Sequence, residues 1–422
     1  MNTRGPVRLA LVGAGIRGMD YSRHAVAGGR AELVAVAEPD DGRRARAAAL
    51  GGDVVQLTSW EELAARPRLA DAVIVATQDR LHTAPAVALA RRGYHVLLEK
   101  PMAPTLAECE QIVAAADEAG VLLAVCHVLR YTRYTRRLKE LLDSGTIGDV
   151  VTVEHLEPVG WWHQAHAYVR GEWRREDGSN PMLLAKSCHD LDWLGWVVGR
   201  PAVRVASFGS LYHFRRSQQP EGAADRCLDC TVEAGCPYSA LRIYRSALRR
   251  RERGRISDWP LAVLTDDISA AGVETALRDG PYGRCVYACD NDVVDHQVVA
   301  LEYEGGVTAS FTMSAFTPLE GRKTRIGGTH GYVEGDGDSL AYVDFRSLSQ
   351  RRVEVPLTPV GGHSAAEGHG GGDPGLIDAF LTAVRTGDHS QVLTTARDSV
   401  ESHRIVWAAE EARRTGTVVA LR

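Results

Sequence analysis

Val7-Arg8-Leu9-Ala10-Leu11-Val12 runs directly into Gly13-Ala14-Gly15-Ile16-Arg17-Gly18, and this junction is the strongest indication of the fold in the chain. The apolar run predicts a buried strand, and the glycines match the G-x-G-x-x-G turn that joins such a strand to a helix. The first glycine allows the tight turn, the second lets backbone approach a pyrophosphate, and the third lets helix and strand pack closely. We therefore expect a dinucleotide site at Gly13, Gly15, Ile16, Arg17 and Gly18, where the helix N-terminus attracts phosphates.

An acidic residue after the next strand supports this expectation. Residues 31–37 form a second apolar run that ends at Glu38, 20 positions after Gly18. This is the spacing of an acid that binds a ribose 2′-hydroxyl. A carboxylate there repels a 2′-phosphate, so the sequence favours NAD over NADP, although Arg43 and Arg44 lie close by and soften that preference. The alternative is a glycine-rich turn followed by a solvated glutamate.

Length and composition limit the classes of protein to consider. At 422 residues the chain exceeds the ~250–300 residues at which single cores stop growing, so we expect two domains. The net charge of −5 gives no reason to expect nucleic acid or an anionic membrane as partner. No run approaches the ~18 apolar residues of a membrane span, and no secretory signal precedes the first strand. We expect a cytoplasmic protein whose eight cysteines are reduced or bind metal.

The order of the expected elements predicts an α/β fold. Strands alternate with helices from residue 7 to about 125, which is typical of a parallel sheet. From about 150 onward, longer strands joined by hairpins predict an open, mostly antiparallel sheet. We expect an N-terminal Rossmann NAD(P)-binding domain at 1–126 and a C-terminal α+β domain for substrate binding and oligomerisation at 127–422. The second domain carries a Cys-rich insertion at about 215–295, a loop at 361–372 and a closing helix at about 374–386.

Two further motifs point to proton chemistry. Glu99-Lys100-Pro101 follows the apolar run 94–98, and the proline keeps Lys100 extended at the strand end, where parallel α/β sheets bind ligands. The helical pattern over 186–194 puts His189 and Asp192 one turn apart, so the carboxylate can orient the imidazole. The alternatives are an exposed strand-end amine and a core histidine.

Taken together, these motifs resemble the Gfo/Idh/MocA family of oxidoreductases over nearly the whole chain. The matching segments are the glycine turn, the segments 77–82 and 127–131, Glu99-Lys100-Pro101, and His189-x-x-Asp192. The resemblance implies that Lys100 and His189 are catalytic and flank the substrate carbon and the nicotinamide. It also implies that the protein is a homodimer or homotetramer. The residues that the resemblance places along the nicotinamide half of the cofactor are Thr77, His82, Glu99 and Lys100.

One position departs from the family pattern. Sugar and inositol dehydrogenases of the family carry an aspartate four residues before the histidine, where this chain has Ala185. The adjacent Lys186 is a third catalytic candidate, as a substrate ligand or a second amine, unless it is a surface residue. The resemblance implies NAD-dependent hydride transfer at a secondary hydroxyl of a sugar, glycoside or cyclic polyol. An NAD-dependent glycoside hydrolase that works by transient ring oxidation and elimination, and a non-catalytic sensor of NAD and sugar, stay open.

An aromatic-rich segment at 161–174 is the expected substrate side. Aromatic faces stack on sugar C–H surfaces and a few polar groups fix hydroxyls, so we expect His163, Tyr168 and Arg170 to contact substrate, with His369 from the late loop. The alternative is a loop with one or two packed tryptophans.

The insertion has the spacing of a metal site. Cys227-x-x-Cys230 is followed by Cys236, and a structural zinc needs four ligands, so Cys285 or Cys289 would complete the set. A single C-x-x-C is weaker than a paired one, and packed reduced cysteines are the alternative. A catalytic metal is not expected.

Overall fold

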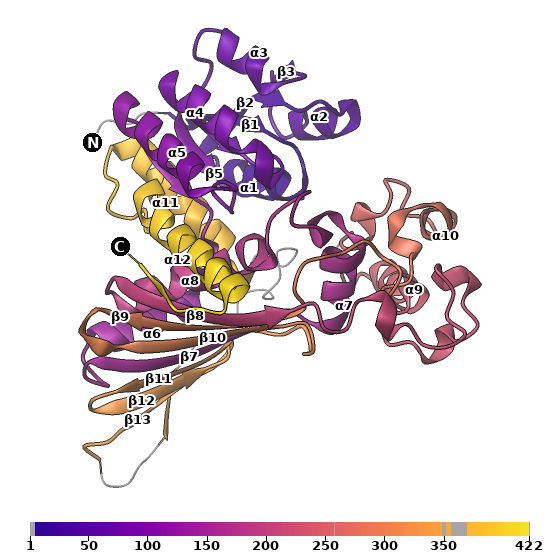
Figure 1. Cartoon of the computed structure of the whole chain (residues 1–422). Coiled ribbons are helices and arrows are strands. Elements are labelled where there is room, and N and C mark those ends of the chain that lie inside the picture. The colour runs from indigo at the N-terminus through magenta and orange to yellow at the C-terminus, as the bar shows by residue number, and fades with distance from the viewer. Residues whose placement is uncertain (1–4, 257, 348–351, 356–368, 422) are drawn as a thin grey trace.

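The computed structural model describes residues 5–256, 258–347, 352–355 and 369–421. It contains two sheets, and the first of them belongs to a doubly wound domain (Figure 1). Its strands pair in parallel in the order β3-β2-β1-β4-β5-β6. Ligands bind such sheets where the strand order reverses, which is here between β1 and β4. The strands are β1 (Val7–Val12), β2 (Ala31–Ala37), β3 (Val55–Leu57), β4 (Ala72–Val75), β5 (His95–Leu98) and β6 (Leu123–Val125). The helices are α1 (Ile16–Ala27), α2 (Asp41–Ala48), α3 (Trp60–Ala65), α4 (Thr83–Arg91) and α5 (Leu106–Ala119).

The second sheet has nine strands in the order β14-β13-β12-β11-β7-β10-β9-β8-β15. The β7–β10 pair is parallel and the other pairs are antiparallel. The strands are β7 (Val150–Pro158), β8 (Ala202–Ser210), β9 (His296–Tyr303), β10 (Thr308–Ser314), β11 (Lys323–Gly328), β12 (Gly331–Gly335), β13 (Leu340–Asp344), β14 (Arg352–Val355) and β15 (Val419–Ala420). The expected fold class, a Rossmann domain followed by an α+β domain with a mostly antiparallel sheet, is confirmed.

Two helices connect the sheets, and Figure 1 shows them between the two. Helix α8 (Met182–Val198) packs on β7 and β10, while α12 (Ala396–Thr415) contacts both α5 and β8. Burial alternates along β9 and β10, as it does when helices cover one face of a sheet and leave the other open. Helix α6 (Arg133–Asp143) joins β6 to β7.

The C-terminal helices return to the first domain. The closing helix α11 (Gly372–Thr386) begins slightly earlier than expected and packs against α1 and β1. Leu376 and Phe380 are buried in the same apolar cluster as Leu9 and Tyr21. The sequence did not predict α12, and most of the loop expected at 361–372 lies outside the described residues. The boundary at 126/127 stays a prediction, since the core of the first domain also takes residues from beyond 370.

The Cys-rich insertion folds into a lobe beside the two domains (Figure 1). Helices α9 (Ala240–Glu252) and α10 (Ala270–Asp279) enclose a small core that includes Tyr244, Leu261 and Val273. The lobe contacts α7 (Trp161–His163) and the π-helical segment Gln164–Arg170 through His166, whose ring stacks on Tyr282 at 5.1 Å. Over the described residues, every helix is too short or too polar to cross a bilayer.

Candidate active site

A cleft of about 2950 Å³ runs between the first domain, the end of β7, helix α8 and the insertion lobe. It collects most of the residues that the sequence singled out. Those lining it are Gly13, Gly15, Ile16, Arg17, Glu38, Thr77, Glu99, Lys100, His163, Tyr168, Lys186, His189 and His369. Three expected residues lie behind its walls instead: Gly18, His82 and Arg170.

The glycine turn is shaped by close backbone contacts. Gly13 has a φ of +88°, and a Cβ there would lie 2.6 Å from the carbonyl oxygen of Ala76 at the end of β4. A Cβ at Gly18 would lie 2.1 Å from the Gly13 oxygen, so helix and strand pack only without a side chain. Gly15 faces open space, with nothing within 4 Å of a Cβ. The turn thus leaves the N-terminus of α1 accessible from the cleft.

Glu38 lies buried at the end of β2, beside the glycine turn. Its carboxylate accepts hydrogen bonds from the backbone N–H of Ala14 at 2.8 Å and of Asp40 at 3.1 Å. Arg43 places its Nε 3.3 Å from the same carboxylate. Arg44 donates to the Glu38 carbonyl at 2.7 Å instead. The acid is therefore fixed in place, with one arginine against its carboxylate.

Arg17 connects the glycine turn to two distant acids. Its Nη2 lies 2.6 Å from Asp373 on α11, and its Nε lies 3.8 Å from Glu99. The hydroxyl of Tyr21 donates to Glu99 at 2.7 Å. The pKa of Asp373 is held below its usual range despite burial, because His369 and Arg17 favour the carboxylate. Glu99 thus faces the start of α1 rather than the substrate side of the cleft.

Lys100 and His189 meet at helix α8. The Nζ of Lys100 donates to the carbonyl oxygen of Ala185 at 2.9 Å, one turn before His189 on the same helix. Position 185 has no carboxylate, but the backbone carbonyl oxygen of Ala185 accepts this hydrogen bond from the lysine amine. Burial lowers the pKa of His189 well below its usual range, and the charge of Lys100 lowers it further. The amine and the imidazole are therefore electrostatic neighbours in one cleft.

His189 is surrounded by other imidazoles. Its ring lies 5.7 Å from that of His127 and 6.0 Å from that of His369. Among the described residues, Nδ1 of His189 and both ring nitrogens of His127 are buried without a hydrogen-bond partner. His369 adopts a φ of +47°, and its Nδ1 lies 3.1 Å from Asp373. Sequence reasoning missed His127 as a neighbour, although it lies in one of the family segments.

The expected pairing of Asp192 with His189 is wrong. Both carboxylate oxygens of Asp192 accept hydrogen bonds at 2.7 Å from Arg130, which follows β6. Two parallel N–H···O bonds from a buried guanidinium hold a carboxylate better than a single imidazole does. Asp192 therefore ties α8 to the first domain, and His189 is not oriented by an aspartate on its own helix.

Lys186 belongs to a charged network that the sequence did not reveal. Its Nζ lies 3.1 Å from Glu157 at the end of β7, and Arg322 lies 2.9 Å from the same carboxylate. Arg322 also pairs with Asp190, which accepts from His155 at 3.2 Å. Glu157 is among the last residues of strand β7, and a single glutamate there carries no sequence signal of its own. The cleft thus has a carboxylate next to Lys186 even though position 185 has none.

Aromatic rings line the part of the cleft that α7 and the insertion lobe form. Trp162 and His163 on α7 lie 5.2 Å and 5.7 Å from the ring of Trp259, which belongs to the insertion lobe. His166 approaches Trp259 at 5.7 Å, and its Nδ1 lies 2.9 Å from the Tyr244 hydroxyl. Trp259 was not predicted, because an isolated tryptophan in an insertion carries no local signal. The lobe therefore contributes part of the cleft.

Two predicted site residues form hydrogen bonds with backbone carbonyl groups outside the cleft. Arg170 is buried and donates to the carbonyl oxygens of Arg284 at 2.7 Å and Tyr238 at 2.8 Å, so the structure places it against the lobe and not in the lining of the cleft. The reason is that the π-helical segment turns this side chain into the base of the lobe. His82 lies 2.8 Å from the Pro101 carbonyl and 3.1 Å from that of Thr77, which supports the loop behind the cleft.

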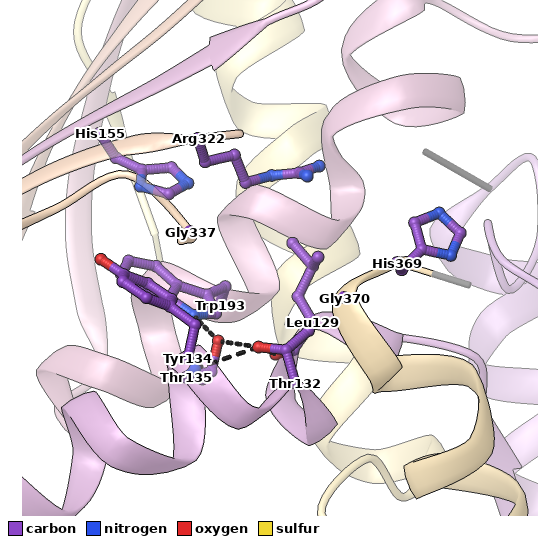
Figure 2. A pocket seen from close by; sticks show the side chains of 10 residues that line it. All are labelled: Leu129, Thr132, Tyr134, Thr135, His155, Trp193, Arg322, Gly337, His369 and Gly370. Carbon is purple, nitrogen blue, oxygen red and sulfur yellow. Dashed lines mark hydrogen bonds between the residues drawn. The ribbon is translucent and has the colours of Figure 1, made fainter. Parts of the chain in front are cut away.

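A second, small cavity of about 50 Å³ adjoins the cleft, and Figure 2 shows His155, Arg322 and His369 at its border. Trp193 donates to Thr135 at 3.0 Å across its floor. Arg322 and His369 line both spaces. Its volume suits a few water molecules rather than a substrate.

Comparison with known proteins assigns the family. The model of an oxidoreductase family with an NAD-binding Rossmann fold matches residues 7–127, and the model of its C-terminal alpha/beta domain matches residues 139–421. The chain belongs to the Gfo/Idh/MocA oxidoreductase family. The resemblance inferred from the motifs is thereby confirmed, and the chain is an enzyme of the oxidoreductase class.

Curated relatives and solved structures match this chain to different extents. The YteT protein of Bacillus subtilis is 26% identical over 328 residues, which cover 74% of this chain and 72% of YteT. A 2,7-anhydro-N-acetylneuraminate hydratase of Mediterraneibacter gnavus is 32% identical over 203 residues, 48% of this chain and 52% of the hydratase. A levoglucosan dehydrogenase solved with NADH and levoglucosan superposes with a TM-score of 0.71 at 17% identity, over 98% of this chain and 99% of that one. This last likeness shows the fold alone.

Proposed function

We propose that this protein is an NAD-dependent oxidoreductase that transfers hydride between nicotinamide and a secondary hydroxyl of a sugar, glycoside or cyclic polyol. The observation that carries the proposal is the single cleft shared by the glycine turn, Glu38, Lys100 and His189. The names of the relatives, which act on sugars and their derivatives, support the substrate class.

The residues of the first domain fit NAD. The open space at Gly15 and the free N-terminus of α1 suit a pyrophosphate, and the fixed carboxylate of Glu38 suits ribose hydroxyls. Bound there, NAD supplies the acceptor for the substrate's hydride. Because Glu38 disfavours a 2′-phosphate, calorimetric titration should give tighter binding of NAD than of NADP. Tighter binding of NADP would contradict the assignment of Glu38.

Proton transfer falls to Lys100 or His189. Burial lowers the pKa of His189 well below its usual range, which favours the neutral imidazole, and its Nδ1 has no partner among the described residues. A group in that state can accept the proton of a substrate hydroxyl. Lys186, held by Glu157, is positioned to bind a hydroxyl or an anionic group of the substrate. These roles do not need a catalytic metal.

A spectrophotometric assay tests the proposal. A panel of sugars, glycosides and inositols should include compounds that reduce NAD, and Lys100→Met should lower kcat by about 10²–10⁴-fold, as for the loss of a group that moves a proton. Lys139→Met is the matched control, because Lys139 pairs with Asp143 on the surface of α6. Wild-type turnover in Lys100→Met would remove the catalytic assignment. No turnover of any panel member, despite NAD and sugar binding, would favour a non-catalytic sensor.

A second candidate function is an NAD-dependent glycoside hydrolase. The cleft continues past Lys186 along Trp162 and Trp259 into the insertion lobe, which leaves room for an aglycone. In this reaction Lys100 or His189 would also remove the C–H proton next to a transient ring ketone. NADH that accumulates with a free sugar favours the dehydrogenase, whereas glycoside cleavage without net NADH favours the hydrolase.

We also propose that copies of the chain associate as a homodimer or homotetramer through the outer face of the second sheet. Phe208, Val298, Thr312 and Leu156 form one row across neighbouring strands on that face. Phe208 is 71% exposed and Val298 40% exposed. Exposed apolar side chains that adjoin one another in this way are typical of an interface.

The expected cytoplasmic location stays a prediction from cysteine usage.

A further inference from the structure

Two groups of side chains outside the cleft carry chemistry that the proposed function does not use. The first is the set of lobe cysteines. Over the described residues no three metal-ligating side chains converge, so the zinc site stays a prediction from cysteine spacing. The second group consists of buried imidazoles behind Lys100. Two of them, His82 and His403, contact the backbone of the segment that carries this lysine.

The residues after Lys100 are held by these two imidazoles, which are far apart in sequence. The backbone N–H of Met102 donates to Nε2 of His403 at 2.9 Å. On the preceding residue, the carbonyl oxygen of Pro101 lies 2.8 Å from Nδ1 of His82. Met102 is fully buried, so its N–H is shielded from water and His403 supplies the acceptor that it needs.

Both ring nitrogens of His403 have defined roles. Nδ1 lies 2.8 Å from the carbonyl oxygen of Ser399, one turn earlier on α12, so Nδ1 carries the proton and donates it. Nε2 is then free of hydrogen and accepts from Met102. Burial lowers the pKa of His403 to about 4, which favours the neutral ring that this arrangement requires.

Helix α12, which carries His403, is itself fixed against the first domain. The N–H of Val125 on β6 donates to the carbonyl oxygen of Thr394, just before the helix, at 2.9 Å. Val400 on α12 is buried in the same apolar cluster as Met102. His403 therefore approaches the lysine segment from a packed helix and not from a loop, as precise placement of a side chain requires.

The backbone of Lys100 is consequently held on both sides. Before it, the N–H of Glu99 donates to the carbonyl oxygen of the last residue of β4 at 2.8 Å. After it comes the bond from Met102 to His403, and the intervening proline restricts Lys100 to extended conformations. The lysine side chain thus starts from a fixed point and ends with Nζ 2.9 Å from the Ala185 carbonyl oxygen.

We propose that His403 positions Lys100 for proton transfer through its hydrogen bond with the backbone N–H of Met102. His403 is fully buried and is not one of the described residues that line the cleft, so it is a positioning residue and not a catalytic one. The role depends on the proposed function, in which Lys100 moves a proton. Misplacing a reacting group by 1 Å can cost about 10²-fold in rate, so a bond two residues away from the lysine is relevant to turnover.

Two amide variants test this role. His403→Gln places an oxygen acceptor near the position of Nε2, whereas the shorter side chain of His403→Asn ends near the position of Nδ1 and does not reach Met102. We expect His403→Asn to lower kcat about 10²-fold with little change in the KM for NAD, and His403→Gln to recover most of that loss. Equal kcat values in the two variants would overturn the role.

Val406→Ala is the matched control. It removes part of a buried side chain from the same helix, in an apolar cluster separate from that of Met102. It should lower stability and leave kcat at the wild-type value. A loss of turnover as large as that of His403→Asn would overturn the role, because any destabilisation of α12 would then have the same effect.

A double variant tests whether His403 acts through Lys100. In the Lys100→Met background, His403→Asn should not lower kcat further, because the group to be positioned is absent. A further loss of about 10²-fold, as in the single variant, would show that His403 acts independently of the lysine and would overturn the role.

Hydrogen exchange provides a readout that needs no substrate. The amide of Met102 should be protected in the wild type, exchange faster in His403→Asn and regain protection in His403→Gln. Rapid exchange of Met102 in the wild type would overturn the role even where a variant does not fold. Unchanged protection in His403→Asn would overturn it as well.

Labelling of Lys100 separates this role from the proposed function. If no compound reduces NAD, the proposed function fails, but acetic anhydride still reports on the lysine amine. Mass spectrometry should find that Lys100 is acetylated faster in His403→Asn than in the wild type, because its contact with Ala185 is loosened. Equal rates of acetylation would overturn the positioning role alone.

Discussion

At the scale of single residues, the chemistry of the cleft depends on neighbours that are distant in sequence. Lys100 follows β5, yet its Nζ contacts Ala185, and its charge adds to burial in lowering the pKa of His189. Lys186 forms an ion pair with the carboxylate of Glu157, which lies on β7 rather than on α8. The missing aspartate at position 185 is therefore offset by two contacts that only the folded chain provides.

The two glycines of the nucleotide turn should respond differently to a methyl group. Gly13→Ala should destabilise the fold by about 1–3 kcal/mol or more, because φ is +88° and the Cβ would meet the Ala76 oxygen. Gly15→Ala should leave the free energy of unfolding nearly unchanged but weaken NAD binding, since its Cβ projects into open space at the phosphate site. Urea denaturation and NAD titration separate the two effects. Equal loss of stability in both variants would contradict this account of the turn.

At the scale of elements, three of the charged or titratable side chains on helix α8 lie in three different surroundings. His189 faces the cleft, Asp190 pairs with Arg322, and Asp192 pairs with Arg130. The helix is buried on nearly every side, so each of the two carboxylates needs its own partner. The helical periodicity of the sequence predicts on which side of the helix each residue lies, but it does not predict which group each side chain contacts.

Asp192→Asn tests the structural role of its pair. The variant should lower the free energy of unfolding by about 3–5 kcal/mol, because it leaves the buried guanidinium of Arg130 without its counter-charge. Asp143→Asn breaks an exposed pair with Lys139 and should cost less than about 1 kcal/mol. Chemical denaturation measures both. Unchanged stability with a shifted pH profile of turnover would instead support the pairing of Asp192 with His189.

At the scale of the whole molecule, buried imidazoles make stability depend on pH. Burial lowers the pKa of His166 to about 3 and that of His403 to about 4. The pKa is also lowered, with burial as the largest cause, for His127, His163, His189 and His369. In the unfolded chain these groups titrate near 6.5.

The protein should therefore lose stability as pH falls from about 6.5 towards 4. Below 6.5 the unfolded chain binds protons that the folded chain does not, so protonation favours unfolding. Urea denaturation at fixed ionic strength between pH 7 and pH 4 should show a steady decrease in the free energy of unfolding. Stability that is constant or rises over this range would contradict the depressed pKa values.

The open sheet face makes a prediction about assembly. Light scattering on the eluting protein should give a dimer or tetramer, and Phe208→Glu should shift it towards monomer, because it places a charge in the exposed apolar row. Val232→Glu, on the exposed surface of the insertion lobe, is the control. Helical content by circular dichroism should stay the same in both. A wild-type monomer at working concentrations would remove the proposed interface.

Features that depend on local backbone rules could be predicted from the sequence. The glycine turn, the alternation of strands and helices, Glu38 at its spacing and Lys100 before a proline follow from sterics and periodicity over a few residues. The partners of buried charges and the position of uniformly buried segments became known from the folded chain alone: Asp192 pairs with Arg130, Arg170 points into the lobe, and α12 lacks a one-sided apolar stripe. The physical reason is that a buried charge pairs with whichever opposite charge the fold brings within reach, and no local pattern encodes that distance.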